Sequence, residues 1–183
     1  MLNKCKSPII PPLVVNNTFI FDCAEKTKHF IDYFSRQCRL IANDSVLPAF
    51  SFKSEARTDN VPISDEEISS LVRQLNPNKA MGPDGISGQM LILCGETVTL
   101  PLKILFQNIL DTSFYPDSWK LANVTPIFKK GDKKIVSNYR PISLLPICSK
   151  IFEKIVFNHV YDYLKRNNLL TVNQSGFRPG DST

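Results

Sequence analysis

Hydrophobic residues recur at three- and four-residue spacing in several segments of the chain, and this spacing is typical of amphipathic helices. In residues 24–40 the apolar positions are Phe30, Ile31, Phe34 and Cys38. A helix is therefore predicted over residues 24–40. Residues 1–23 show neither a helical nor a strand period and carry clusters of proline and asparagine. We interpret them as a linker, and residues 43–62, rich in serine, asparagine and charge, as a second loop.

A second helix is predicted to begin just after Ser64. The sequence S-D-E-E forms a capping box, with Ser64 as the N-cap and Glu67 reaching back to its amide. The apolar positions that follow are Ile68, Leu71, Val72 and Leu75. This helix is expected to stop at Asn76, because Pro77 disfavours a helical residue before it. Residues 82–85, Gly-Pro-Asp-Gly, predict a turn.

The later part of the chain combines helices with a change of period. Helical spacing recurs in residues 87–94, 97–111 and 150–165. Trp119 is interpreted as a core anchor. Residues 121–128 and 138–145 are rich in strand-forming side chains, and residues 129–134 between them read Lys-Lys-Gly-Asp-Lys-Lys. This pattern predicts a β-hairpin with a lysine-rich tip, and Pro126 places its first strand at a sheet edge.

Composition narrows the class of protein. Of 183 residues, 43% are hydrophobic and 21% charged, which excludes a disordered or collagen-like chain. Thirteen prolines against seven glycines favour a loop-rich α+β fold. No apolar run approaches the roughly 18–20 residues of a membrane helix, and the short run at residues 9–15 is broken by prolines. We expect an intracellular protein of the nucleus or cytoplasm, not secreted and without a membrane partner.

The net charge of +5 is concentrated in the last third of the chain. Residues 120–183 hold 11 Lys/Arg and 4 Asp/Glu, whereas residues 1–119 hold 11 and 13. A basic surface binds polyanions by displacing their counterions; the alternative is a solvated basic face. Lys129 and Arg140 are phosphate-binding candidates, because a hairpin can bring a lysine point charge and an arginine fork to one edge, as suits a triphosphate. Alternatively, they are solvated charges of an edge strand.

The residues offer no complete active site. The five cysteines are odd in number and form no C-x-x-C pair, so neither a disulfide framework nor a zinc site is expected. His29 and His159 are isolated and are interpreted as structural or surface residues. The chain has no phosphate-binding loop, dinucleotide fingerprint, nucleophile elbow or clustered carboxylates. No catalytic residue, metal ligand or cofactor is therefore predicted in this chain.

Five blocks of sequence, taken together, carry a more specific signal. They are N-K-A-M-G-P-D-G-I-S at 78–87, P-D-S-W-K-L-A-N-V-T-P-I-F-K-K-G-D at 116–132, N-Y-R-P-I-S-L-L at 138–145, K-I-F-E-K at 150–154 and Q-S-G-F-R-P-G-D-S-T at 174–183. In this order they resemble the first part of the reverse transcriptase of non-LTR (LINE-type, jockey-like) retrotransposons. A weaker likeness extends back to F-I-D-Y-F-S at 30–35.

This resemblance implies a fold and a set of contacts. The fold would be the fingers and the beginning of the palm of a right-hand polymerase, incomplete. Residues 1–62 would be a linker or pre-polymerase segment with one helix near 24–40, and residues 63–183 a reverse transcriptase domain truncated before its catalytic aspartates. By resemblance, Lys129 and Arg140 would contact the nucleotide triphosphate. Arg178 would lie by the template and nucleotide, or else hold its own loop.

The resemblance also implies what the chain lacks. The family's metal-binding aspartates lie downstream of the Gly-Phe-Arg block, beyond the end of this sequence, as do the rest of the palm and the thumb. Mg²⁺ is expected for the complete enzyme, whose partners are an RNA template, a DNA primer and deoxynucleotides. We therefore expect this chain alone to be inactive. Apolar faces such as Leu102/Phe106/Ile109 and Ile151/Ile155 are expected to stay exposed where palm elements are missing.

Three interpretations remain open from the sequence. The chain is a fragment of an RNA-directed DNA polymerase without independent activity, a retained nucleic-acid-binding module that uses the basic hairpin, or a subunit-like piece that works with a separately supplied palm.

Overall fold

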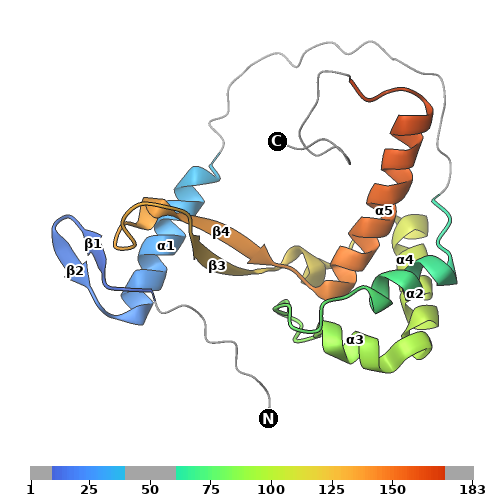
Figure 1. Cartoon of the computed structure of the whole chain (residues 1–183), viewed down its shortest axis with the longest axis horizontal. Coiled ribbons are helices and arrows are strands. Elements are labelled where there is room, and N and C mark those ends of the chain that lie inside the picture. The colour runs from blue at the N-terminus through green and yellow to red at the C-terminus, as the bar shows by residue number, and fades with distance from the viewer. Residues whose placement is uncertain (1–9, 40–60, 172–183) are drawn as a thin grey trace. The chain divides into compact units, whose positions relative to one another are not determined.

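The computed structural model describes residues 10–39 and 61–171 (Figure 1). The chain folds into two compact units that alternate along the sequence. Among the described residues, unit 1 comprises 10–39 and Val124–Ser143, and unit 2 comprises 61–123 and 144–171. Helices and short strands occur together, as the α+β prediction requires. The domain boundary near residue 62 stays a prediction, because these units describe packing and are discontinuous in sequence.

Unit 1 begins with a small hairpin that the sequence analysis missed. Strands β1 (Leu13–Val15) and β2 (Thr18–Ile20) pair antiparallel, joined by Asn16 and Asn17 at φ values of 49° and 62°. A two-residue turn with both φ values positive matches the twist of paired strands, and asparagine tolerates that conformation. The linker interpretation was therefore wrong for residues 13–20. Each strand is only three residues long, too short to display an alternating period.

Helix α1 (Cys23–Gln37) confirms the helix predicted near residues 24–40. The carboxylate of Asp22 caps it by accepting the Glu25 N–H at 2.9 Å. Phe30 and Phe34 are buried against Leu13 and Tyr139, which form the centre of unit 1. Ile31, expected on the apolar face, is instead 60% exposed. The buried face of α1 is thus a narrow aromatic stripe.

Unit 2 begins with helix α2 (Asp65–Arg73), which starts where the capping box predicts. The Ser64 hydroxyl accepts the Glu67 N–H at 3.1 Å. The Glu67 carboxylate, expected to reach back to Ser64, instead lies 3.3 Å from Nε2 of His159. His159 therefore has a structural contact that ties α5 (Ile147–Arg166) to the start of α2.

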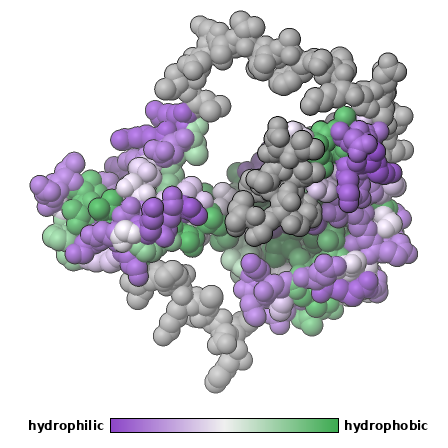
Figure 2. Space-filling model, turned by 45° about the horizontal axis from the view of Figure 1, so that its top comes forward, coloured by the Kyte–Doolittle hydropathy of each residue, from purple (hydrophilic) through white to green (hydrophobic). Residues whose placement is uncertain are grey.

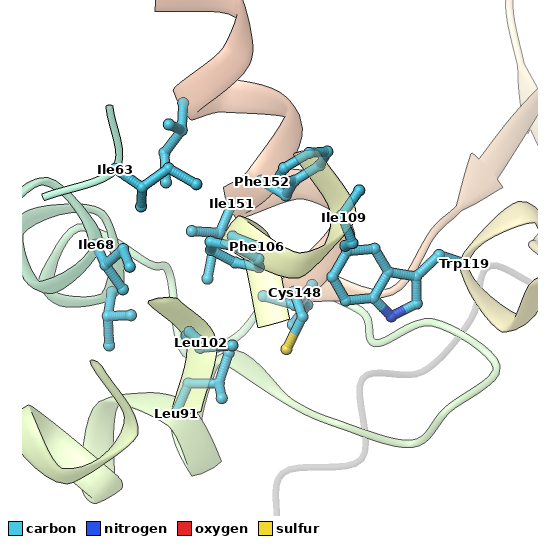
Figure 3. Close-up of a cluster of buried hydrophobic side chains, with 13 residues drawn as sticks. Ile63, Ile68, Leu91, Leu102, Phe106, Ile109, Trp119, Cys148, Ile151 and Phe152 are labelled. Carbon is cyan, nitrogen blue, oxygen red and sulfur yellow. The ribbon is translucent and has the colours of Figure 1, made fainter. Parts of the chain in front are cut away.

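The remaining helices of unit 2 enclose one core (Figure 3). They are α3 (Gly88–Cys94), the 3₁₀ segments η1 (Gly95–Val98) and η2 (Asp117–Lys120), α4 (Thr99–Thr112) and α5. Trp119 is buried and packs edge-on against Phe106, with ring centroids 6.2 Å apart, which confirms its role as a core anchor. The predicted helix near 150–165 is confirmed and begins three residues earlier.

This core corrects the expectation of exposed apolar faces on α4 and α5. Leu102, Phe106 and Ile109 of α4 and Ile151 and Ile155 of α5 are all buried, because the two helices pack against each other and against Trp119 and Phe152. Hydrophobic side chains do reach the surface elsewhere in both units (Figure 2). On unit 2 they include Leu93 of α3 and Leu100 and Ile104 of α4, together with Phe114 and Leu121 outside these helices.

The helical stretch Gly88–Thr112 is long and apolar enough to cross a membrane by length and composition alone. Such a stretch was not predicted from the sequence. Core helices of soluble proteins share these properties, and this stretch contributes Leu91, Leu102, Phe106 and Ile109 to the unit 2 core. It also bends at Gly95, where φ is +57°.

Candidate functional site

The predicted lysine-tipped hairpin is present in unit 1. Strands β3 (Asn123–Phe128) and β4 (Tyr139–Leu144) form a two-stranded sheet. At its tip end the Lys129 N–H donates to the Asn138 carbonyl at 2.8 Å, and the rings of Phe128 and Tyr139 lie 5.6 Å apart. Both contacts set the same register, in which Phe128 stands opposite Tyr139.

This register separates a core face from a free face. Tyr139 is buried and its ring packs on Phe30 with centroids 5.0 Å apart, so the Phe128/Tyr139 face covers the core of unit 1. Because successive strand residues point to opposite faces, Lys129 and Arg140 both point away from that core. In this register Lys129, the first residue after β3, lies diagonally across the pair from Arg140. Both residues are exposed, and the strand alternation places them on the same side of the hairpin.

Both side chains are unpaired in the part of the chain that the structure describes. The ion pairs there involve other residues, and neither Lys129 nor Arg140 makes a side-chain hydrogen bond to described protein atoms. Two exposed cations on one face of a short sheet can bind an anion without first breaking an internal salt bridge. Such a pair supplies several donors, since arginine offers a planar fork and lysine a rotating ammonium.

The loop between the strands is held in one conformation by Asp132 and Asn138. The Asp132 carboxylate accepts a hydrogen bond from the Lys134 N–H at 2.9 Å. The backbone carbonyl of Asp132 accepts one from the Asn138 side-chain amide, also at 2.9 Å. Gly131 has a φ of +90°, and a Cβ there would come within 2.8 Å of the Asn138 side chain. Asp132 therefore shapes the loop.

Two tip lysines are attached to the body of unit 1. The Lys133 ammonium lies 5.4 Å from the centroid of Phe128, and the Lys134 ammonium 5.7 Å from that of Phe19. The Lys134 carbonyl accepts the Val14 N–H at 2.8 Å, which joins the tip to β1. The missed β1–β2 hairpin is thus part of the support of the candidate site.

Tyr139 links the core to the tip. Its hydroxyl donates to the Lys133 carbonyl at 2.7 Å. Burial, and then the negative charge of Asp132, raise the pKa of Tyr139 above its usual value, so the phenol keeps its proton to a higher pH than an exposed tyrosine does.

Unit 1 also has a cleft that was not predicted from the sequence. A cleft of about 510 Å³ lies between the turn after β1, one side of α1 and the segment before β4. Polar side chains of α1, His29, Asp32 and Arg36, line it together with Val136 and Ser137. Their positions at i, i+3 and i+7 place them on one side of the helix. This spacing is the feature of the sequence from which their grouping could have been predicted.

The sequence of the chain is similar to those of several retrotransposon proteins. It is 34% identical over 123 residues to the probable RNA-directed DNA polymerase from transposon BS of Drosophila melanogaster, covering 67% of this chain and 14% of that protein. It is 28% identical over 161 residues to the RNA-directed DNA polymerase from mobile element jockey of Drosophila funebris, covering 84% and 18%. The chain is homologous to RNA-directed DNA polymerases of jockey-like and other non-LTR retrotransposons.

A third relative, the jockey polymerase of Drosophila melanogaster, is 32% identical over 114 residues, covering 62% of this chain and 12% of that protein. The retrotransposon homologue described here therefore spans less than a fifth of the length of these relatives. No protein-family model matches the chain.

One predicted site residue of this polymerase homologue is not placed by the structure. Arg178, with the Gly-Phe-Arg block, lies outside the described residues. Within residues 10–39 and 61–171, no three His, Cys, Asp or Glu side chains gather into a group that could hold a metal ion. No catalytic step is assigned to the described residues.

Proposed function

We propose that the chain forms the fingers and the beginning of the palm of a right-hand, RNA-directed DNA polymerase of a non-LTR retrotransposon, and that Lys129 and Arg140 bind the triphosphate of the incoming deoxynucleotide. The observation that supports this most directly is the shared free face of these two unpaired cations, opposite the Tyr139 core, in a chain homologous to such polymerases. The partners of the complete enzyme would be an RNA template and a DNA primer. Arg178 would contribute beside the template.

In this proposal the hairpin binds and orients the nucleotide and does no covalent chemistry. Arg140 would hold two phosphate oxygens through its fork, and Lys129 would neutralise a third as a point charge. In polymerases, carboxylates hold the Mg²⁺ ions that stabilise the attacking and leaving oxygens during phosphoryl transfer. We assign those carboxylates to segments outside this sequence, so the 183-residue chain alone is inactive. Its place in the nucleus or cytoplasm stays a prediction.

The test is equilibrium binding of a fluorescent deoxynucleoside triphosphate to the full chain. Each of Lys129→Ala and Arg140→Ala is expected to weaken binding about tenfold or more, because Lys129 loses one charge-assisted hydrogen bond and Arg140 loses two. Lys130→Ala, which removes the same charge from the neighbouring position, is the matched control and should change binding little. Arg140→Lys keeps the charge but not the fork and should restore only part of the affinity. Equal losses in all three alanine variants would contradict the proposal.

A second candidate function is a nucleic-acid-binding module without catalysis. The observation that favours it is the excess of basic residues over residues 120–183. This function requires no contact with a triphosphate. It would be supported if the chain bound RNA but did not bind the deoxynucleoside triphosphate.

A further inference from the structure

Helix α5 carries a pair of aromatic side chains on its solvent side. The rings of Phe157 and Tyr161 stack with centroids 5.6 Å apart and planes inclined by 21°, and the Lys154 ammonium lies 4.8 Å from the Phe157 centroid. Phe157 is 50% exposed. The large aromatic residues of the unit 2 core, by contrast, are buried on the other side of this helix. Phe157 is exposed and Tyr161 is partly exposed, so this aromatic pair reaches the solvent.

Lysines extend this aromatic pair into a stripe. Its members, spaced by four, three, four and four residues, are Lys150, Lys154, Phe157, Tyr161 and Lys165. With 3.6 residues per turn, this spacing keeps all five on one side of the helix over a length of about 22 Å. All three lysines are exposed. We call this set the α5 stripe.

The acidic residues of α5 do not neutralise the α5 stripe. Glu153 and Asp162 lie about 80–100° away from it around the helix axis. The Glu153 carboxylate is further occupied, because it accepts hydrogen bonds from the hydroxyls of Tyr115 at 3.0 Å and Ser149 at 3.1 Å. The α5 stripe therefore presents positive charge at both ends and stacked rings in the middle.

Single-stranded nucleic acid matches these properties better than a protein surface or a duplex. An apolar protein partner would bury the lysine charges, whereas a polyanion pairs with them. A duplex hides the faces of its bases, whereas an unpaired strand offers them for stacking on aromatic side chains. The combination of basic residues and exposed aromatics is the arrangement that sequence-tolerant single-strand binding requires.

We propose that the α5 stripe binds single-stranded nucleic acid, with bases stacked on Phe157 and Tyr161 and phosphates held by Lys150, Lys154 and Lys165. The site belongs to unit 2 and shares no residue with the β3–β4 hairpin. The inference rests on the proposed function only for the presence of nucleic acid as a partner.

The test measures fluorescence anisotropy of a labelled 12-nucleotide single strand titrated with the full 183-residue chain. The variant Phe157→Leu/Tyr161→Leu keeps apolar bulk but removes the rings, and it should weaken binding about tenfold or more. Phe114→Leu replaces an aromatic that is similarly exposed but lies outside α5, and it should leave binding unchanged. Wild type should bind an abasic strand of equal length more weakly than the normal strand. Wild type and the leucine variant should have the same affinity for the abasic strand.

Two further measurements keep the outcomes distinct. Lys154→Gln/Lys165→Gln leaves the rings in place and should lower both the affinity and its salt dependence, so it tests the stripe even if the leucine variant unfolds. Lys129→Ala/Arg140→Ala should lose nucleotide binding while retaining the stacking effect, which separates failure of the hairpin proposal from failure of this one. Equal affinity of folded wild type and leucine variant for the single strand would overturn the inference. So would a wild-type dimer that the leucine variant converts to a monomer without any nucleic-acid binding.

Discussion

The ring of Tyr139 packs edge-on against the ring of Phe30, with centroids 5.0 Å apart and planes at 74°. One residue of this pair comes from the β3–β4 hairpin and the other from α1, more than a hundred positions earlier in the chain. Because Tyr139 faces this core, its neighbour Arg140 must face solvent. The exposure of the candidate phosphate-binding face is thus a consequence of core packing.

Replacement of Tyr139 should therefore damage unit 1 in two separable steps. Tyr139→Phe removes the hydrogen bond to the Lys133 carbonyl and should cost about 1 kcal/mol of unfolding free energy. Tyr139→Ala also empties the space beside Phe30 and should cost about 3–5 kcal/mol. Urea unfolding followed by circular dichroism measures both. The exposed neighbour variant Arg140→Ala should be neutral within about 0.5 kcal/mol, and a destabilised Arg140→Ala would contradict the orientation deduced for the hairpin.

Gly82 should not tolerate a side chain. A Cβ at this position would come within 2.5 Å of the Pro146 nitrogen and 2.7 Å of the Leu145 carbonyl carbon, and backbone atoms at the start of α5 cannot move aside cheaply. Gly82→Ala should cost about 1–3 kcal/mol or more in unfolding free energy. Gly85→Ala is the matched comparison, since its φ of +72° is strained for alanine but no atom lies within 4 Å, so only about 1 kcal/mol is expected. If thermal unfolding showed equal losses, close approach would not be the cause.

The buried thiol of Cys148 should make unit 2 less stable at high pH. Burial, and to a lesser extent the negative charge of Asp84, raise the pKa of Cys148 from 9.0 to about 11. The folded state thus keeps a proton that the unfolded chain releases at lower pH. The corresponding stability is present below pH 9 and is lost as the pH rises through 11. Tyr115 and Tyr139 have raised pKa values too, so unfolding of wild type must be compared with that of Cys148→Ala between pH 8 and 11. An identical pH dependence in both would show that Cys148 plays no part.

Salt dependence of RNA binding should report the phosphate contacts of the hairpin. If Lys129 and Arg140 each neutralise one phosphate of a single strand, Lys129→Ala/Arg140→Ala should reduce the slope of log K against log salt concentration by about 1.4. Titration of a labelled RNA at several salt concentrations gives this slope. If the double variant keeps the wild-type slope but no longer binds the triphosphate, the two residues contact the nucleotide and not the RNA. If the slope of the wild-type chain is already flat, the chain does not function as a nucleic-acid-binding module.

The elements found from the sequence are those whose burial repeats with a clear period. Such a period is present in helices α1, α2 and α5, and a clear change of period marks the β3–β4 hairpin. The N-cap of α2 could be predicted from the residue type of Ser64 alone. The β1–β2 hairpin has strands of three residues, too few for alternation to stand out. Burial of Ile151 and Ile155 was missed because periodicity identifies an apolar face without naming the element that covers it. The same limit hides the Phe157–Tyr161 stack, since aromatic residues on a helix read alike whether they point to core or to solvent.

Primer extension tests which part of a polymerase this chain supplies. With an RNA template, a DNA primer, deoxynucleotides and Mg²⁺, the pure chain should give no extended product, because phosphoryl transfer needs metal-holding carboxylates and the described residues offer no such group. Addition of a separately produced polymerase segment that carries those carboxylates distinguishes the remaining possibilities. If extension is restored and Arg140→Ala abolishes it, the chain supplies the nucleotide-binding part of the polymerase. Restored extension that is insensitive to both Lys129→Ala and Arg140→Ala would place the triphosphate contacts elsewhere. Extension by the pure chain would overturn the assignment of catalysis to segments outside it.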